Sequence, residues 1–354
     1  MVPTPLQDAL GPQTVNVARP RDVSGYRGAI TATRFADPQQ EFSALLNGCG
    51  IYDLGFRARI SLSGGDRVRW MNGMVTNNIR DLAVGHGVYA FLLNPQGRIL
   101  GDMQVYNRGE SLLVETDRSQ VEKVIATFDH FIIMDDVELV NISENQTALG
   151  LAGPRSRELL NAVGIAVPEM EPSQVMTPQC ACECDCLECT VIRGEDAPRE
   201  SYEIWLDPKD VYKTWQALIS AGATPVGSEA LEMQRITAGI PLYGTDIRER
   251  DLPQETEQMR ALNFNKGCYV GQEIVERIRA QGHVNKKLVR LEVDGAEPLA
   301  AGTRLKAGDA DAGEITSAVY SPRSGKVAAM GYVRTAFAEA GTPVQAGEVD
   351  ARVV

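Results

Sequence analysis

The residues best suited to chemistry stand close together in the segment Lys266-Gly267-Cys268-Tyr269-Val270-Gly271-Gln272-Glu273. Glycine adopts backbone conformations that other residues avoid, so the glycines of this segment allow the Cys268 thiol to approach a ligand closely. Lys266 lies nearby, and the helical pattern of the following run EIVERIRA predicts that Cys268 stands near a helix N-terminus. A cation and a helix N-terminus each lower the pKa of a thiol and make the thiolate more available. Cys268 is therefore a candidate catalytic residue, and the alternative is a small apolar side chain buried in a tight turn.

Three further charged residues, in separate segments, are candidates for contacts with a substrate or cofactor. Asp53 in the run IYDL is a general base or hydrogen-bond acceptor in one interpretation, and a helix cap or turn residue in the other. Glu203 in the run YEIW offers two acceptor oxygens, but a glutamate between aromatic residues in a strand is more often an exposed edge residue. Arg235 opens the run RITAGIPLYG, and its planar guanidinium suits planar carboxylates, with a surface ion pair as the alternative.

The densest group of cysteines, by contrast, is predicted to be structural. Thiolates favour zinc or iron–sulfur clusters, so the spacing C-x-C-x-C-x-C-x-x-C makes metal binding the alternative. The first four cysteines alternate with Ala, Glu and Asp, however, as in a strand with thiols packed inward and acids in solvent. Strand residues two apart are separated by roughly 6.6 Å, too far to share one ion unless the backbone bends. We predict no metal site in this cluster, which consists of Cys180, Cys182, Cys184, Cys186 and Cys189.

The composition of the chain predicts a cytoplasmic globular protein of two or three packed units. It has 354 residues, of which 44% are hydrophobic and 23% are charged. The longest apolar runs fall short of the roughly 18 residues that a membrane helix needs, and the N-terminus lacks the pattern of an export signal. A net charge of −12 argues against direct nucleic-acid binding, because basic residues are needed to displace phosphate counterions. The seven cysteines do not indicate disulfides, because the cytoplasm keeps thiols reduced.

Hydrophobic periodicity predicts an α+β unit in the first part of the chain. The opening stretch to about residue 33 is rich in Pro, Gly and polar residues and is expected to lie over the surface. Asp37 is predicted to cap a helix that has Pro38 at its first position and stops at Gly48. Strands and helices then succeed one another in an order typical of α+β rather than doubly wound folds. The predicted strands are 58–64, 88–93, 99–106 and 112–116, and the predicted helices are 66–74 and 119–131.

A second α+β unit is predicted from about residue 140, and a small all-β unit ends the chain. Proline at positions 154 and 208 is predicted to open two helices, which alternate with strands at 148–153, 190–193 and 202–206. From Lys286 onward, short alternating runs are separated by Gly, Pro and Asp turns, which is typical of a small β-barrel or sandwich. The predicted domains are therefore residues 1–284, with an internal split near residue 140, and residues 285–354.

The segment 266–273 resembles the K-G-C-[FY]-x-G-Q-[DE] signature of the YgfZ branch of the YgfZ/GcvT family. The same family includes the glycine-cleavage T-protein and the mitochondrial iron–sulfur assembly factor related to YgfZ. The resemblance runs from about Ala36 to Val354, with individually weaker matches outside this signature. It implies a T-protein-like ring, in which two α+β units and a C-terminal β-barrel surround a central tetrahydrofolate.

The resemblance also implies roles for individual residues. Asp53 takes the place of the carboxylate that faces the reacting nitrogen of tetrahydrofolate, so it is a second candidate catalytic residue. Glu203 takes the place of the glutamate that accepts the amino and ring N–H groups of the pterin. Arg235, Tyr243 and Lys266 lie in matching segments and are implied to bind the cofactor, Arg235 through the carboxylate tail.

The function implied by the resemblance is that of a tetrahydrofolate-binding accessory protein for iron–sulfur cluster assembly or repair, which indirectly supports tRNA modification. Its expected partners are a folate and iron–sulfur client proteins. The chain departs from the T-protein pattern at Gly55-Phe56-Arg57, where the T-protein has Ser-His-Met, and at Thr237, which replaces a glutamate. A tetrahydrofolate-dependent aminomethyltransferase is the alternative. A second alternative is a non-catalytic module that binds a metal or ligand through the cysteine cluster.

Overall fold

The computed structural model describes residues 1–11, 18–178, 188–195 and 200–354. The chain forms two compact units, each assembled from separated stretches. Unit 1 contains residues 1–71, 79–88 and 103–231, and unit 2 contains residues 72–78, 89–102 and 232–354. The predicted domain divisions near residue 140 and after residue 284 stay predictions. The predicted strand through Cys180, Cys182, Cys184 and Cys186 lies outside the described residues.

A six-stranded sheet organises one part of unit 1, with five of its strands drawn from residues 147–226. Its helices α1 (Pro5–Ala9), α5 (Ser156–Ala162) and α6 (Val211–Ser220) share a buried apolar core with one face of the sheet. Leu149, Ile204 and Trp215 lie in this core. The helix α2 (Pro38–Asn47) contacts two strands near the other edge. The strand order is β11 (Val175–Met176), β12 (Cys189–Arg193), β13 (Ser201–Leu206), β10 (Thr147–Ala152), β4 (Gly50–Asp53) and β14 (Thr224–Val226).

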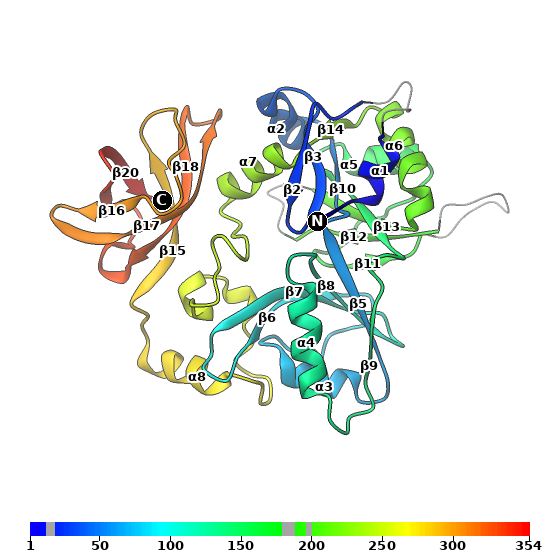
Figure 1. Ribbon diagram of the computed structural model, residues 1–354, viewed down its shortest axis with the longest axis horizontal. Coiled ribbons are helices and arrows are strands. Elements are labelled where there is room, and N and C mark those ends of the chain that lie inside the picture. The colour runs from blue at the N-terminus through cyan, green and yellow to red at the C-terminus, as the bar shows by residue number, and fades with distance from the viewer. Residues whose placement is uncertain (12–17, 179–187, 196–199) are drawn as a thin grey trace. The chain divides into compact units, whose positions relative to one another are not determined.

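A second sheet, of five strands, faces the first one within unit 1 (Figure 1). Tyr106 and Leu113 of this sheet share a buried cluster with Ile192 and Trp205 of the six-stranded sheet. The helices α3 (Arg67–Met74) and α4 (Val121–Phe131) accompany the second sheet in the chain. Its strand order is β6 (Gly87–Leu93), β7 (Ile99–Asn107), β8 (Leu112–Asp117), β5 (Arg57–Ser63) and β9 (Glu138–Asn141), and β6 and β7 continue from unit 1 into unit 2.

The prediction that the opening stretch lies over the surface is wrong for α1 and β3, which carry buried residues, whereas β1 and most of β2 are exposed. Thr4 caps α1 by accepting a hydrogen bond from the Gln7 N–H, and Leu6 and Leu10 are buried in the core. The strands β1 (Val2–Pro3), β3 (Ala29–Arg34) and β2 (Asp22–Tyr26) form a small sheet in that order. The apolar segments that the tertiary structure buries here are short and lie among Pro, Gly and polar residues, so they give no periodic signal.

The local signals of the helices and strands predicted between residues 37 and 131 are confirmed. The Asp37 side chain accepts a hydrogen bond from the Gln39 N–H at 2.9 Å, and α2 begins at Pro38 and ends before Gly48. The strands β5 to β8 and the helices α3 and α4 begin and end within two residues of the predicted bounds.

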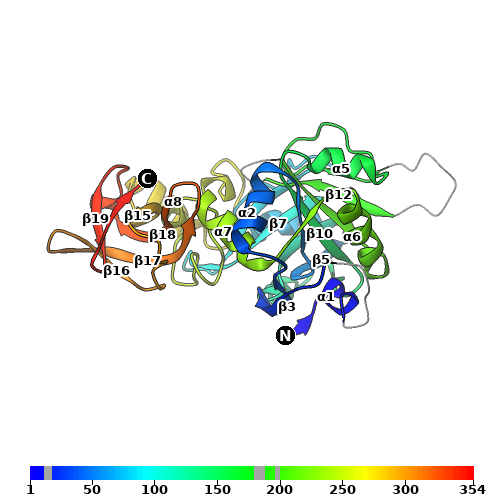
Figure 2. The ribbon, with the colours of Figure 1, turned by 90° about the horizontal axis from the view of Figure 1, so that it is seen from above.

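A closed barrel of six strands ends the chain within unit 2 (Figures 1 and 2). Its interior is filled by small aliphatic side chains such as Val327, Ala329 and Ala346, as expected for a barrel with few strands. Around the barrel the order is β15 (Lys286–Val293), β18 (Lys326–Arg334), β17 (Ala310–Ser321), β16 (Arg304–Ala307), β19 (Pro343–Ala346) and β20 (Val349–Val353). The predicted α+β class with a C-terminal β-barrel is confirmed.

The rest of unit 2 joins the barrel to a second apolar core. The helix α7 (Ser228–Ala238) continues from unit 1 into unit 2, and short 3₁₀ turns lead to α8 (Gln272–Gln281). Phe91, Ile247 and Val275 lie in this core. Among the residues that the structure describes, no helix is both long and apolar enough to cross a membrane.

Candidate functional site

Glu203 and Tyr52 lie in one row across the six-stranded sheet. Both residues pair with Gly150 of β10, Glu203 from β13 and Tyr52 from β4. Paired residues on neighbouring strands point to the same face, so the two side chains share a face with Gly150 between them. A Cβ at Gly150 would lie 2.0 Å from Cε2 of Tyr52, so only glycine leaves room for this ring. The missing side chain thus allows the Tyr52 ring to lie over Gly150.

The opposing sheet presents a buried network of charges to this face. Arg57 pairs with Asp117 across β5 and β8, and its Nη1 donates to the Asp117 carboxylate at 2.5 Å. Arg59 pairs with Glu115 in the same ladder, and its Nη2 donates to Glu115 Oε1 at 2.8 Å. Arg57 Nη2 also donates to Glu115 Oε2 at 3.3 Å, so the two ion pairs form one connected network.

Glu203 is joined to this network through Trp205. The Arg59 guanidinium lies over the Trp205 ring, 4.7 Å from its centroid, and the Trp205 indole N–H donates to Glu203 Oε2 at 2.9 Å. Tyr106 packs edge-on against Trp205, with 5.2 Å between ring centroids. Nε and Nη1 of Arg59 have no hydrogen-bond partner among the described residues, although the side chain is fully buried. Buried donors of this kind are normally satisfied by water or by a ligand.

The environment of Glu203 favours its neutral form. Burial in the apolar and aromatic surroundings is the main cause that raises its pKa to about 7, and the negative charge of Glu115 adds to this. Arg57, the Trp205 hydrogen bond and Arg59 act in the opposite direction. Its second oxygen, Oε1, has no hydrogen-bond partner among the residues described. The site therefore holds a half-buried carboxyl group that is oriented on one side and able to accept N–H groups on the other.

Asp53 does not join Glu203. It is adjacent to Tyr52 in β4, so its side chain points to the opposite face of the sheet. There the hydroxyls of Thr4 and Thr31 donate to Oδ2, and the Gly55 N–H donates to Oδ1 at 2.7 Å. Burial raises the pKa of Asp53 against the opposing effect of these hydrogen bonds. In this geometry the carboxylate connects the N-terminal segment to β4.

Arg235 is the centre of a buried ion-pair cluster in unit 2. Its Nη1 donates to Asp246 Oδ2 at 2.7 Å, and its Nε and Nη2 both donate to the Glu232 carboxylate. Longer bonds run from Nη2 to the Ser317 hydroxyl of the barrel and from Nη1 to the Ile240 carbonyl. A guanidinium has five N–H donors, and these five bonds occupy all of them. A ligand carboxylate would have to displace one of the present acceptors.

Tyr243 and Lys266 are likewise engaged inside unit 2. The Tyr243 hydroxyl donates to the Leu100 carbonyl at 2.6 Å. The Lys266 ammonium donates to the main-chain carbonyls of Asn72, Val75 and Asn77. An ammonium group has three N–H donors, so these carbonyls use the full set and fix the segment 72–77 to the cysteine-containing loop.

Cys268 lies in that loop, which precedes α8. Its side chain is exposed, whereas Cys49 and Cys189 are buried. Burial raises the pKa of the Cys189 thiol to about 11 and also raises that of Cys49. Cys268 is therefore the accessible thiol among the three described cysteines. Within the described residues, no three His, Cys, Asp or Glu side chains are grouped closely enough to hold a metal ion.

The tertiary structure adds four residues to the candidate site: Tyr52, Arg59, Glu115 and Trp205. Trp205 had a local signal, because residues two apart in a strand share a face and Glu203 was already a candidate. Tyr52 lies beside Asp53 but on the other face. Arg59 and Glu115 are 56 positions apart, so no local pattern predicts that they pair.

Two protein-family models together match nearly the whole chain. The model of the GCVT N-terminal domain matches residues 6–266. The model of the glycine cleavage T-protein C-terminal barrel domain matches residues 286–354.

Two relatives illustrate the likeness at the level of sequence. The aminomethyltransferase of Rubrobacter xylanophilus is 28% identical over 318 residues, which cover 89% of this chain and 83% of that protein. The aminomethyltransferase of Nostoc is 26% identical over 337 residues, covering 91% and 87% of the two chains.

The fold is shared with a solved structure. The glycine cleavage system aminomethyltransferase T from Bartonella henselae superposes with a TM-score of 0.85 at 21% identity, covering 94% of this chain and 92% of that chain.

Proposed function

Because the chain belongs to the GCVT family, we propose that it binds tetrahydrofolate, or a one-carbon derivative, and acts on it as a folate-dependent aminomethyltransferase. Tetrahydrofolate is the cofactor of the aminomethyltransferases in this family. The named relatives and the family models support this function over that of an iron–sulfur accessory protein.

The observation that carries the proposal is the half-buried carboxyl group of Glu203. A pterin presents an amino group and ring N–H groups side by side, and a carboxylate accepts such a pair in a bidentate geometry. The Trp205 N–H holds one oxygen of Glu203, and the other has no partner among the described residues. The rings of Tyr52 and Tyr106 belong to the same apolar cluster as Trp205, which suits a flat heterocycle.

The chain's own residues would bind and orient the cofactor, and tetrahydrofolate would supply the nitrogen that carries the one-carbon unit. Arg59 and Glu115 hold the Trp205 ring, and Trp205 in turn holds Glu203. Glu203 must be ionised to accept two N–H groups, so binding releases a proton wherever the carboxyl group starts out neutral.

The other predicted site residues remain proposals with defined requirements. For Arg235 to bind the carboxylate tail, the guanidinium must exchange the partly exposed Glu232 carboxylate for the ligand. For Asp53 to act as a base, the lone pair of Oδ1 that its three hydrogen-bond donors leave free must become accessible to the substrate. Tyr243 and Lys266 would act through the main-chain segments that they fix.

A second candidate function, favoured by the exposed Cys268, is the YgfZ-type role in maintaining iron–sulfur proteins. The cysteine stands in a segment that matches the YgfZ signature, and its thiol is accessible. Arg57 replaces the methionine of the T-protein pattern, and it forms ion pairs with Asp117 and Glu115. In this function the partners are iron–sulfur client proteins.

The first test is a calorimetric titration of the protein with tetrahydrofolate. Glu203→Ala should weaken binding by about 1.5–3 kcal/mol, the range for hydrogen bonds to a charged group. Glu110→Ala is the matched control, because Glu110 is exposed and lies in the same unit. Saturable binding that only the Glu203 variant loses supports the proposal. Equal affinity in all three proteins would place the pterin elsewhere.

Two assays separate the candidate functions. An aminomethyltransferase releases ammonia from an aminomethylated lipoyl carrier and transfers the one-carbon unit to tetrahydrofolate, and Cys268→Ser should leave this activity intact. In the iron–sulfur role, Cys268→Ser should fail to restore iron–sulfur enzyme activity in a deletion strain. Full restoration by that variant would exclude a chemical role for the thiol.

A further inference from the structure

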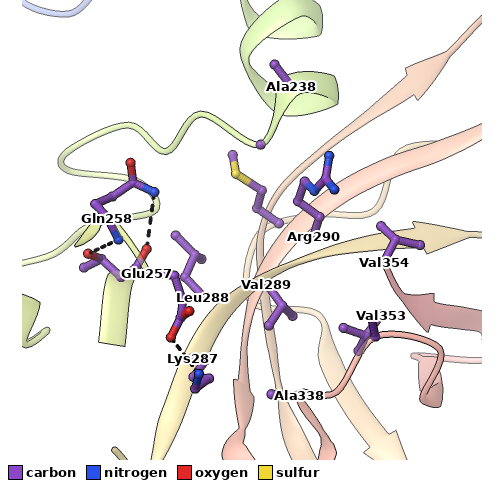
Figure 3. Close-up of a pocket in the computed structure, with 14 residues that line it drawn as sticks. Ala238, Glu257, Gln258, Lys287, Leu288, Val289, Arg290, Ala338, Val353 and Val354 are labelled. Carbon is purple, nitrogen blue, oxygen red and sulfur yellow. Dashed lines mark hydrogen bonds and ion pairs between the residues drawn. The ribbon is translucent and has the colours of Figure 1, made fainter. Parts of the chain in front are cut away.

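A cavity of about 320 Å³ lies within unit 2, beside the outer face of the barrel strand β15 (Figure 3). Its walls come from the end of α7, the residues after η2, β15, the segment before β19 and the end of the chain. This volume is at the lower end of the range for small-molecule sites, roughly 300–1,000 Å³. No residue of the proposed folate contacts lines it.

The charged side chains of the lining leave one cation uncompensated. Lys287 forms an ion pair with Glu257 at 3.0 Å. Arg290 also lines the cavity, and its guanidinium has no hydrogen bond or ion pair with any residue that the structure describes. The side chains of the lining carry two positive charges and one negative charge, and the main-chain carboxylate of Val354 adds a second negative charge, so Arg290 is the charged side chain of this lining that lacks a partner among the described residues.

Arg290 is an exposed residue whose aliphatic stem packs closely against Gly239. A Cβ at Gly239 would lie 2.4 Å from Cδ of Arg290, so the aliphatic stem of the arginine occupies the space of the missing side chain. Gly239 also has φ +73°, a conformation that other residues rarely adopt. Figure 3 shows Arg290 directed from β15 toward the segment that follows α7. The stem is thus packed, and the guanidinium remains at the cavity.

The remaining lining is apolar except for Thr256, whose hydroxyl donates to the Pro253 carbonyl, and Gln258. Leu288, Met330 and Val353 supply buried hydrophobic surface. Gln258 supplies an amide whose hydrogen bonds to Arg260 and to the Thr256 carbonyl are long, at 3.4 and 3.5 Å. A ligand that fits this lining has an apolar body, one negative charge and room for one amide contact.

We propose that this cavity binds a small monocarboxylate with an apolar body, its carboxylate paired with Arg290. The guanidinium fork matches a planar carboxylate. A single unpaired cation balances one negative charge, whereas a phosphate dianion or a nucleic acid would require more. The site is separate from the proposed folate contacts.

The test is a fluorine-19 NMR titration of the full-length chain with 4-(trifluoromethyl)benzoate. The neutral amide, 4-(trifluoromethyl)benzamide, has nearly the same shape and serves as the ligand control. Arg290→Gln removes the cation, and Ala340→Trp fills the mouth, because Ala340 is an exposed lining residue. Arg304→Gln is the matched protein control, since Arg304 is an exposed barrel arginine outside the lining.

The benzoate should bind saturably, at least about tenfold more tightly than the benzamide, as expected when a charge-assisted hydrogen bond is lost. Arg290→Gln should lower the affinity for the benzoate by a similar factor. Ala340→Trp should abolish its binding, and Arg304→Gln should leave the affinity unchanged. Equal binding of the two ligands, full binding by Arg290→Gln, or no saturable binding up to about 10 mM would overturn the proposal. If Arg290→Gln also lost affinity for tetrahydrofolate, this arginine would belong to the folate site, and the proposal of a separate carboxylate site would be overturned.

Discussion

Replacing Glu203 with glutamine removes a titrating group and keeps its shape. The amide oxygen of the substituted side chain can still accept the Trp205 N–H, so the row formed with Tyr52 and Gly150 is preserved. What changes is the ability to become an anion. The substitution therefore tests whether the charge of Glu203 serves binding at the expense of stability.

The pKa of about 7 determines how binding depends on pH. If only the carboxylate form binds the pterin N–H groups, about one tenth of the free protein is competent at about pH 6 and about nine tenths at about pH 8. Tetrahydrofolate affinity should therefore rise about tenfold between these values. The glutamine variant should bind more weakly throughout and lose this dependence.

From the same pKa we predict that the stability of the ligand-free protein falls with pH, whereas its affinity for tetrahydrofolate rises. The folded value of about 7 lies above the ordinary value of 4.5, so the ligand-free protein loses stability as pH rises through this interval. One pKa unit corresponds to about 1.4 kcal/mol. Allowing for the residual exposure of Glu203, its ionisation should cost the fold about 1–3 kcal/mol above pH 8. Glu203→Gln should be more stable than the parent by this amount at about pH 8 and similar to it near pH 5.

Urea unfolding and calorimetric titration at several pH values measure both effects, with Glu110→Gln as control. A residue that only supports the fold would lose stability on substitution, whereas a binding residue kept in an unfavourable environment gains it. An affinity that does not change with pH, together with a destabilised variant, would refute the reasoning.

Three other substitutions or modifications test the geometry elsewhere. Asp53→Asn should destabilise the protein by about 1–3 kcal/mol in urea unfolding, because a buried acceptor of three hydrogen bonds is impaired; unchanged unfolding would show that these bonds contribute nothing. Gly150→Ala should cost about 1–3 kcal/mol through overpacking against Tyr52 and should weaken folate binding, and a neutral result in both assays would contradict the close approach. Cys268 should react with iodoacetamide well before Cys49, which is buried with a raised pKa, as followed by peptide mass spectrometry. Equal rates would mean that the loop shields the thiol.

Local patterns in the sequence were sufficient for most of the secondary structure. The capping residue Asp37, the proline that follows it, and the alternation in β5 and β8 act over a few neighbouring residues. Such signals predict where an element begins and which residues share a face. They failed in the opening stretch, where α1 is short and its burial depends on contacts with distant parts of unit 1.

The candidate site depended on contacts that no local pattern encodes. Asp53 and Glu203 were both predicted from their own segments, yet strand alternation in β4 and β13 places them on opposite faces of one sheet. Arg235 and Lys266 were predicted to face a ligand, yet acceptors far along the chain, such as Ser317 for Arg235, occupy their donors.

Local periodicity and short motifs were enough to predict the family, the α+β class and the C-terminal barrel, and the family resemblance made Glu203 a candidate. Contacts between distant segments were needed to show that Arg59 stacks on Trp205, that the Arg290 guanidinium has no partner among the described residues, and that Asp53 is held by the N-terminal segment. The physical reason is that the energy of a buried polar group depends on all its neighbours in space, and most of those are distant in sequence.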